Sequence, residues 1–209
     1  MQASMWGERF LFGYGVARSF DTAFKHFTAA ADFGLPEAMN MIGTMFEHGL
    51  GQEVNLDAAL KWYAAATEKD LPEGINNLAR LYELGKGCPK DIHTAFALYK
   101  KAADMAHVDA MTSLGHAYEK GLGTTVDFGQ AFKWYMEAAQ KGYARAQNFL
   151  GSMYYAGKGV NQQYDEAVRW YKKAAAQGNP HAQNNLGTSL FRLFDDKSTF
   201  THSCIRYLL

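Results

Sequence analysis

Two short stretches of the chain place a lysine between two glycines, at residues 85–87 and 157–159. Lysine in a glycine-rich loop suggests phosphate binding, because backbone N–H groups and the ammonium group together bind phosphate oxygens. A phosphate-binding loop also needs a five-residue segment that begins with glycine directly before the Gly-Lys pair. It further needs a Ser or Thr directly after the lysine, and neither stretch has these features. The motif therefore does not by itself predict a nucleotide site.

Other residues with catalytic or metal-binding chemistry are scattered along the chain. The seven histidines form no HExxH motif and no cluster with cysteine, so no metal site is predicted. Cys88 and Cys204 form no CxxC pair, and they predict free thiols rather than a disulfide framework or a zinc site. Ser152 lies in LGSMYY, which is not the Gly-x-Ser-x-Gly of a nucleophile elbow. We therefore expect a protein that is not an enzyme and that holds no metal and no cofactor.

The Gly-x-Gly element recurs along the chain with a fixed period. Each copy lies 36 residues after the one before: FGYGV at 12–16, HGLGQ at 48–52, LGKGC at 84–88, KGLGT at 120–124 and AGKGV at 156–160. A fixed period between about 20 and 50 residues is typical of a solenoid. Because a nucleotide site normally occurs once in a domain, the repetition indicates a turn that belongs to the architecture.

Apolar and small residues within each repeat follow helical spacing. With positions counted from Ala38, the first half has an apolar stripe at positions 1, 5, 8 or 9, and 12, which is one face of an amphipathic helix. In the second half, positions 22 and 29 are always Ala and position 26 is always aromatic, which marks the buried face of a second helix. Position 6 is small, so a neighbouring helix can approach closely there: Gly7, Gly43, Ala79, Gly115, Gly151 and Gly187.

Turn and capping residues mark the ends of these predicted helices. Glycine at position 12 is predicted to end each first helix, and an Asp at position 18 or 20 is predicted to be the N-cap or a first-turn residue of each second helix: Asp21, Asp57, Asp91, Asp127 and Asp165. Gly34, Gly142 and Gly178 are expected to close second helices, and Pro36, Pro72 and Pro180 to stop them from continuing. The prediction is an all-α fold of about eleven helices. Its five full units are 2–37, 38–73, 74–109, 110–145 and 146–181, with a sixth first helix at 182–194.

Residues 195–209 match no repeat. This tail is interpreted either as a degenerate second helix that caps the array or as an aberrant end, and it is expected to be less ordered than the repeats.

The repeat pattern resembles that of a known family. The residues A-x-x-x-L-G-x-x-Y-x-x-G-x-G-V, followed by an acid and by A-x-x-W-Y-x-x-A-A-x-x-G, are similar to the Sel-1-like repeat (SLR) family, which is related to tetratricopeptide repeats. The stretch AQNFLGSMYYAGKGVNQQYDEAVRWYKKAAAQGNPH carries nearly every element. The resemblance implies a right-handed α/α superhelix that serves as a scaffold or adaptor for protein partners. Among known settings, protein quality control in endoplasmic-reticulum-associated degradation is the leading expectation, and bacterial signalling or host interaction is the alternative.

A hydrolase is the alternative from another class. Some cysteine-rich relatives in the SLR family are assigned β-lactam-hydrolysing or β-lactam-binding activity, and they carry a regular cysteine pair in each repeat. This chain has two cysteines in non-equivalent positions, which disfavours that activity.

Composition narrows the classes of partner. The net charge is zero and 48% of the residues are hydrophobic, which indicates a folded core without a general attraction to nucleic acid or anionic membranes. No apolar run is long enough for a transmembrane helix, so direct membrane insertion is not expected. A cytoplasmic location is expected if the chain is complete, and the lumen of the endoplasmic reticulum or a membrane-associated complex if it is a fragment.

Polar residues of the first helices are the candidate partner-binding residues. Positions 3, 7 and 10 are predicted to point away from the buried stripe and to line the concave groove of the superhelix. Amides and hydroxyls both donate and accept hydrogen bonds, so such a ladder suits a peptide backbone, and the glutamates would favour a basic partner residue. The candidates are Asn40, Thr44, Glu47, Asn76, Arg80, Glu83, Thr112, His116, Glu119, Asn148, Ser152, Tyr155 and Asn184.

The same residues have a purely structural interpretation. The asparagines can link neighbouring helices, and Glu47, Glu83 and Glu119 can form a solvated or locally paired face.

Overall fold

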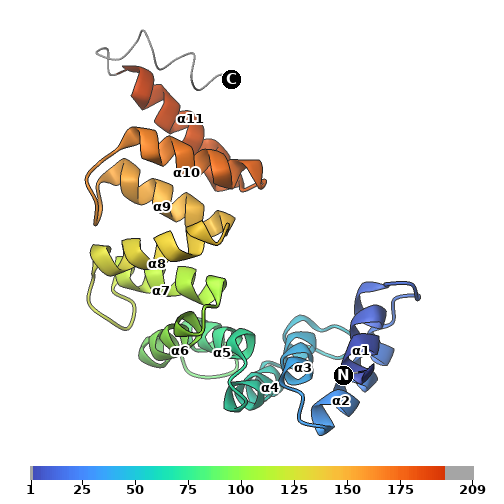
Figure 1. The fold of residues 1–209 in the computed structure, drawn as a ribbon. Helices are drawn as coiled ribbons and strands as arrows, with labels where there is room; N and C mark the ends of the chain where they lie inside the picture. The colour runs from blue at the N-terminus through green and yellow to red at the C-terminus, as the bar shows by residue number, and fades with distance from the viewer. Residues whose placement is uncertain (1, 196–209) are drawn as a thin grey trace. The chain divides into compact units, whose positions relative to one another are not determined.

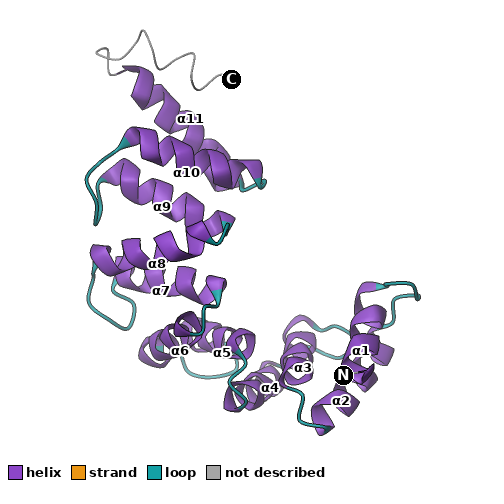
Figure 2. Cartoon of the chain, in the orientation of Figure 1, coloured by secondary structure: helices purple, strands orange, loops and turns teal. Residues whose placement is uncertain are grey.

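A computed structural model describes residues 2–195, and the expectations for residues 196–209 lie outside the described part of the chain. The described residues form eleven helices joined by short turns, without a strand (Figures 1 and 2). This result confirms the all-α solenoid class and its helix-turn-helix repeats. The helices are α1 (Gln2–Phe12), α2 (Phe20–Asp32), α3 (Pro36–His48), α4 (Leu56–Glu68), α5 (Pro72–Leu84), α6 (Ile92–Asp104), α7 (Val108–Lys120), α8 (Phe128–Gln140), α9 (Ala144–Ala156), α10 (Tyr164–Ala176) and α11 (Pro180–Asp195).

The chain divides into two compact units, residues 1–110 and 111–209, called here the N-terminal and the C-terminal unit. In the N-terminal unit each helix from α1 to α6 packs on the helix next to it in sequence. In the C-terminal unit α8 packs on α9, α9 on α10 and α10 on α11. Each helix pair therefore buries its apolar face against its neighbours within the unit, as expected for a repeat array.

The position-12 glycines end the first helices, as predicted. Gly49, Gly85 and Gly157 have left-handed backbones with φ of 68°, 68° and 67°. The N–H of Gly49 donates to the carbonyl oxygen of Met45, which satisfies one of the free carbonyls at the helix end. The Gly-Lys-Gly stretches are thus helix-ending turns.

The helix starts also follow the predicted capping residues, with one refinement. Asp91 and Asp127 are the N-caps of α6 and α8, where their side chains accept N–H groups of the first turn. Pro36 and Pro72 occupy the first turns of α3 and α5, because proline has no N–H to leave unsatisfied there. The first helices accordingly begin two residues before the expected unit starts at 38 and 74, and the sixth spans Pro180–Asp195.

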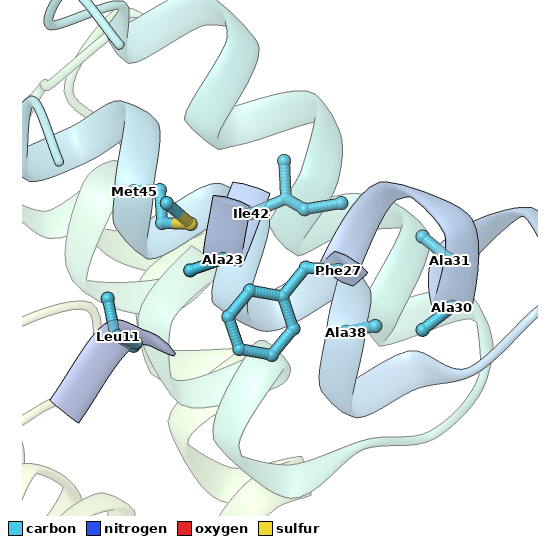
Figure 3. Packing of buried hydrophobic residues seen from close by; sticks show 8 residues of the cluster. All are labelled: Leu11, Ala23, Phe27, Ala30, Ala31, Ala38, Ile42 and Met45. Carbon is cyan, nitrogen blue, oxygen red and sulfur yellow. The ribbon is translucent and has the colours of Figure 1, made fainter. Parts of the chain in front are cut away.

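A glycine–aromatic contact lies at the centre of four of the five helix pairs, and the remaining pair has Ala79 at the same position. A Cβ atom added to Gly43 would lie 2.7 Å from the Tyr63 ring, and one added to Gly151 would lie 2.8 Å from the Tyr171 ring. In the first pair the Phe27 ring occupies the middle of the buried cluster formed by α1, α2 and α3 (Figure 3). The small residue at position 6 is therefore required by the aromatic residue at position 26, whose ring lies directly against the backbone of the first helix.

Candidate partner-binding surface

The thirteen candidate residues lie on first helices of both units. Asn40, Thr44 and Glu47 are on α3, and Asn76, Arg80 and Glu83 are on α5, all in the N-terminal unit. The C-terminal unit holds the others: Thr112, His116 and Glu119 on α7, Asn148, Ser152 and Tyr155 on α9, and Asn184 on α11.

The expectation that all these side chains point away from the core is wrong for three of them. Glu47 is 6% exposed, Thr112 is fully buried and Asn148 is 8% exposed. For Glu47 and Asn148 the physical reason is that the first helix of the next repeat supplies their hydrogen-bond partners. At the other extreme Asn184 is exposed, and most of the remaining candidates are partly buried.

Glu47 is held by an arginine of the next repeat. Both terminal nitrogens of Arg80 donate to its carboxylate at 2.7 Å, and the hydroxyl of Tyr63 donates at 2.9 Å. Burial pushes the pKa of Glu47 up, but the hydrogen bonds and charge of Arg80, with the Tyr63 hydroxyl, outweigh it and hold this pKa below its ordinary value. Glu47 is therefore an ionised, internally paired group, and it is not available to a basic residue of a partner.

A tyrosine–glutamate hydrogen bond recurs in the central repeats. The position-26 hydroxyl donates to the position-10 carboxylate in three pairs, Tyr63–Glu47 at 2.9 Å, Tyr99–Glu83 at 2.7 Å and Tyr135–Glu119 at 3.2 Å. Burial, together with the neighbouring carboxylate, raises the pKa of Tyr135, so its proton stays in place.

Sequence reasoning missed this bond, although the sequence holds a signal for it. The first repeat pairs Leu11 with Phe27, so the glutamate and the hydroxyl are absent together. In the fifth repeat, where Tyr155 replaces the glutamate, the Tyr171 hydroxyl donates to Ser152 at 3.0 Å instead.

The lysine of each Gly-Lys-Gly turn reaches the glutamate of the repeat before it. The ammonium group of Lys86 lies 3.9 Å from the Glu47 carboxylate, and that of Lys158 lies 3.5 Å from the Glu119 carboxylate. Lys158 also lies over the Phe128 ring, 5.3 Å from its centroid. Both lysine side chains remain nearly half exposed, so these contacts contribute modestly to stability. The lysines join neighbouring repeats within a unit.

Asparagines form bridges between consecutive first helices. The side-chain nitrogen of Asn77 donates to the side-chain oxygen of Asn40 at 2.9 Å, and Asn185 donates to Asn148 in the same way at 3.0 Å. Both bridges join residues 37 positions apart, so they repeat with the architecture. The structural interpretation of Asn40 and Asn148 as links between helices is thus confirmed for their side-chain oxygens.

The hydroxyl and aromatic candidates are also engaged within the protein. Ser152 donates to the backbone oxygen of Asn148 at 3.1 Å while it accepts the Tyr171 hydroxyl, so its oxygen is used structurally. Thr44 donates to the backbone oxygen of Asn40. Tyr155 packs edge-on against Tyr164, with ring centroids 5.3 Å apart.

One pocket of the C-terminal unit includes two of the candidates. It has a volume of about 530 Å³ and lies between the N-terminal halves of α9 and α11. Asn148 and Asn184 line it, as predicted candidates, and five other residues complete it: Arg145, Phe149, Asn179, His181 and Asn185. Sequence reasoning missed Arg145 and His181, although both stand where three earlier repeats have an acid, at Glu37, Glu73 and Asp109.

Neither a metal-binding cluster nor a membrane-spanning helix occurs in the described part of the chain. Over residues 2–195, no group of three or more His, Cys, Asp or Glu side chains is placed to hold a metal ion. None of the helices within that range combines the length and the apolar character needed to cross a membrane.

Solved structures of similar proteins support the fold. A Sel1 repeat protein from Oxalobacter formigenes is 35% identical, with a TM-score of 0.84 over 89% of this chain and 76% of that protein. A protective antigen of uropathogenic Escherichia coli with an SLR fold is 32% identical, with a TM-score of 0.80 over 89% of this chain. This chain spans only 40% of the length of that antigen. An immunity protein from Pseudomonas aeruginosa is 25% identical, with a TM-score of 0.59 over 87% of this chain and 68% of that protein.

The family model agrees with the structural neighbours. A comparison with curated proteins gave no match. The Sel1 repeat model matches five consecutive segments, residues 3–34, 36–71, 72–107, 108–143 and 144–179, and their starts follow the observed helix starts. The period, the glycine–aromatic packing and these matches together show that the chain belongs to the Sel1 repeat family.

Proposed function

We propose that this protein is a non-catalytic scaffold that binds peptide segments of partner proteins on the first helices of its repeats. Sel1 repeat proteins are generally protein-interaction scaffolds. The observation that carries the proposal for this chain is the pocket between α9 and α11, because side-chain amides of the two helices line it together. Amides can bond both the N–H and the C=O groups of an extended chain, so they can hold a peptide without demanding one sequence.

The two units contribute to this function in different ways. In the N-terminal unit the Glu47 carboxylate and the Asn40 side-chain oxygen are used to join repeats. In the C-terminal unit the side-chain oxygen of Asn148 joins repeats in the same way, but Asn148 also lines the pocket and Asn184 is exposed. We therefore place the principal peptide contacts on α9 and α11.

Two settings were expected for such a scaffold, and one observation favours the bacterial one. Two neighbours that share at least 30% identity over 89% of this chain come from Oxalobacter formigenes and Escherichia coli. We therefore put a bacterial-type interaction scaffold ahead of a role in endoplasmic-reticulum-associated degradation.

Selection from a random peptide library tests the function directly. Phage displaying peptides of about twelve residues would be panned on the full chain, and the enriched peptides would be synthesised and titrated by fluorescence anisotropy. We expect enriched peptides to bind at least about tenfold more weakly to Asn184→Trp, since an exposed bulky ring there covers the pocket.

A matched control separates this effect from a general effect of tryptophan. Gln140→Trp places the same ring at an exposed site at the end of α8, and it should leave binding unchanged. A library that yields no enriched peptide in repeated selections would overturn the scaffold proposal. Equal binding by the wild type and Asn184→Trp would overturn the placement on α9 and α11.

A further inference from the structure

We propose that the pocket between α9 and α11 recognises the side-chain carboxylate of an Asp or Glu in a bound peptide. This inference rests on the proposed peptide-binding function and names the chemistry of its ligand. It reverses the expectation, drawn from the position-10 glutamates, that a partner would present a basic residue.

The first turns of α9 and α11 carry Arg or His where those of α3, α5 and α7 carry an acid. Acidic residues stabilise the N-terminal end of a helix because the helix dipole is positive there. α3, α5 and α7 each have one such acid, Glu37, Glu73 and Asp109, whereas α9 and α11 have none. Arg145 and His181 occupy the equivalent positions. The positive ends of two helices therefore face the pocket without a compensating carboxylate of their own.

The orientation of Asn179 adds a hydrogen-bond donor to this pocket. Its side-chain oxygen accepts the backbone N–H of Ala182 at 2.9 Å, and a backbone N–H can only be met by the oxygen of the amide. The side-chain nitrogen of Asn179, a pocket-lining residue, is left to donate elsewhere.

Asn148 supplies a second donor from the floor of the pocket. It is 8% exposed, and its side-chain oxygen is occupied by Asn185. That bond uses the amide oxygen, so the side-chain nitrogen is the group that Asn148, a pocket-lining residue, has left to donate to a ligand. A ligand atom that accepts hydrogen bonds would satisfy this nitrogen.

Arg145 and Phe149 complete the recognition of a carboxylate. The guanidinium of Arg145 lies 5.7 Å from the centroid of the Phe149 ring. The Phe149 ring is itself stacked on Tyr135, with centroids 5.0 Å apart, so it is a fixed wall. The ring can pack against the methylene groups of an acidic side chain while the guanidinium binds its carboxylate.

The charges around the pocket favour an acidic peptide over a nucleic acid or another polyanion. None of the seven lining residues is Asp or Glu, so a carboxylate meets no local repulsion. The chain has a net charge of zero, which gives it no general attraction to phosphate backbones. One arginine, one histidine and two amide donors match a single carboxylate held beside a peptide backbone.

A titration followed by nuclear magnetic resonance tests the pocket itself. The probe is N-acetyl-aspartate N-methylamide, added to the nitrogen-15-labelled full chain, with the asparagine analogue as the neutral control. We expect the side-chain amide signals of Asn148 and Asn179 to shift with the aspartate probe, and binding of the asparagine analogue to be at least about fivefold weaker.

A double variant in the pocket and a control variant outside it test which side chains bind the carboxylate. Arg145→Gln combined with His181→Gln removes the guanidinium and the imidazole from exposed positions, and it should weaken binding of the aspartate probe at least about fivefold while the thermal melt is unchanged. Lys133→Gln removes a positive charge from the exposed face of α8 and should leave the titration unchanged. Equal binding of the two probes, or no effect of the double variant, would overturn the proposal.

Three further results would contradict the proposal in distinguishable ways. Tighter binding of inorganic phosphate than of the aspartate probe would assign the pocket to phosphoryl groups. Tighter binding of N-acetylalanine, which has a free terminal carboxylate, would assign it to chain ends. Enriched library peptides without an acid at a fixed position would overturn the carboxylate inference while the scaffold function stands. If the library yields no enriched peptide while the aspartate probe still shifts the amide signals, the scaffold function alone is overturned.

Discussion

The carboxylate of Glu47 on α3 receives both terminal nitrogens of Arg80 on α5, each at 2.7 Å, although the two residues are 33 positions apart in the sequence. The Glu47 side chain is 2% exposed and that of Arg80 is 34% exposed. A buried carboxylate in this geometry depends on its partner, because an unpaired charge in the protein interior is costly. The pair therefore joins two consecutive repeats of the N-terminal unit.

Removing the arginine from this pair should destabilise the protein. Arg80→Ala leaves Glu47 buried without its cation, and we expect the free energy of unfolding to fall by about 2 kcal/mol. This value lies below the usual range for fully buried pairs because a third of the Arg80 side chain is open to water. Urea denaturation followed by far-ultraviolet circular dichroism measures the change.

An exposed ion pair provides the control for Arg80→Ala. Arg169 and Glu166 on α10 also form a salt bridge, but the Arg169 side chain is 62% exposed. Arg169→Ala should change the free energy of unfolding by less than about 0.5 kcal/mol. Equal losses for the two variants would show that burial of Glu47 does not determine the strength of its pair.

The contribution of Glu47 to stability should depend on pH. Because Arg80 holds the pKa of Glu47 below its ordinary value, the stabilisation is present above the unfolded pKa of about 4.3 and is lost as the pH falls through the folded pKa. The difference in free energy of unfolding between the wild type and Glu47→Gln should therefore shrink from about pH 7 to about pH 3. A difference that stays constant over this range would contradict the assigned ionisation.

The glycine–aromatic contact predicts opposite results for two alanine substitutions in helices. Gly43→Ala places a methyl group 2.7 Å from the Tyr63 ring and should destabilise the protein by about 1–3 kcal/mol. Gly187→Ala, at the same repeat position, meets no atom within 4 Å in the described part of the chain. It should be neutral or stabilising by up to about 1 kcal/mol, because alanine favours the helix. Thermal melts of the two variants measure these changes. Similar losses of stability at both sites would contradict this explanation of position 6.

The two glycines of the second Gly-Lys-Gly turn should differ in their tolerance of substitution. Both have positive φ, 67° at Gly157 and 68° at Gly159. A Cβ atom at Gly157 would approach Gln162 at 3.2 Å, whereas one at Gly159 would collide with the backbone carbonyl of Phe128. Gly157→Asn should therefore cost about 1 kcal/mol or less, since asparagine adopts this backbone, and Gly159→Asn about 3 kcal/mol. Urea denaturation that ranks the two variants in the reverse order would contradict the packing of this turn on α8.

Much of the fold could be predicted from local patterns. The positions of Gly49, Ala59 and Tyr63 within one period are enough to predict a helix, its end and the face of the next helix. These features depend on neighbours within about four residues and on a turn, and such short-range requirements repeat visibly in each unit. The start of each first helix at Pro36 or Pro72 was less predictable, because proline suits both the end of one helix and the first turn of another.

The candidate site was predicted less completely, for a reason that Glu47 and Asn148 illustrate. Both are polar residues on a helix face opposite the apolar stripe, and this pattern does not distinguish a face exposed to water from a face that meets another helix. Arg145 and His181 were overlooked for the converse reason. Each is an ordinary exposed residue in sequence, and only the packing of α9 beside α11 brings them to one pocket.

The sequence by itself determined the helical repeat, the turns, the small residue at position 6 and the aromatic residue at position 26, because these depend on contacts within one period. The tertiary structure alone decided what the polar residues do. Arg80 meets Glu47 33 residues away, Asn185 meets Asn148 37 residues away and Lys158 meets Glu119 39 residues away. Each partner belongs to the neighbouring repeat. No single period encodes how the repeats stack, and this stacking decides which side chains join neighbouring repeats and which remain available to a ligand.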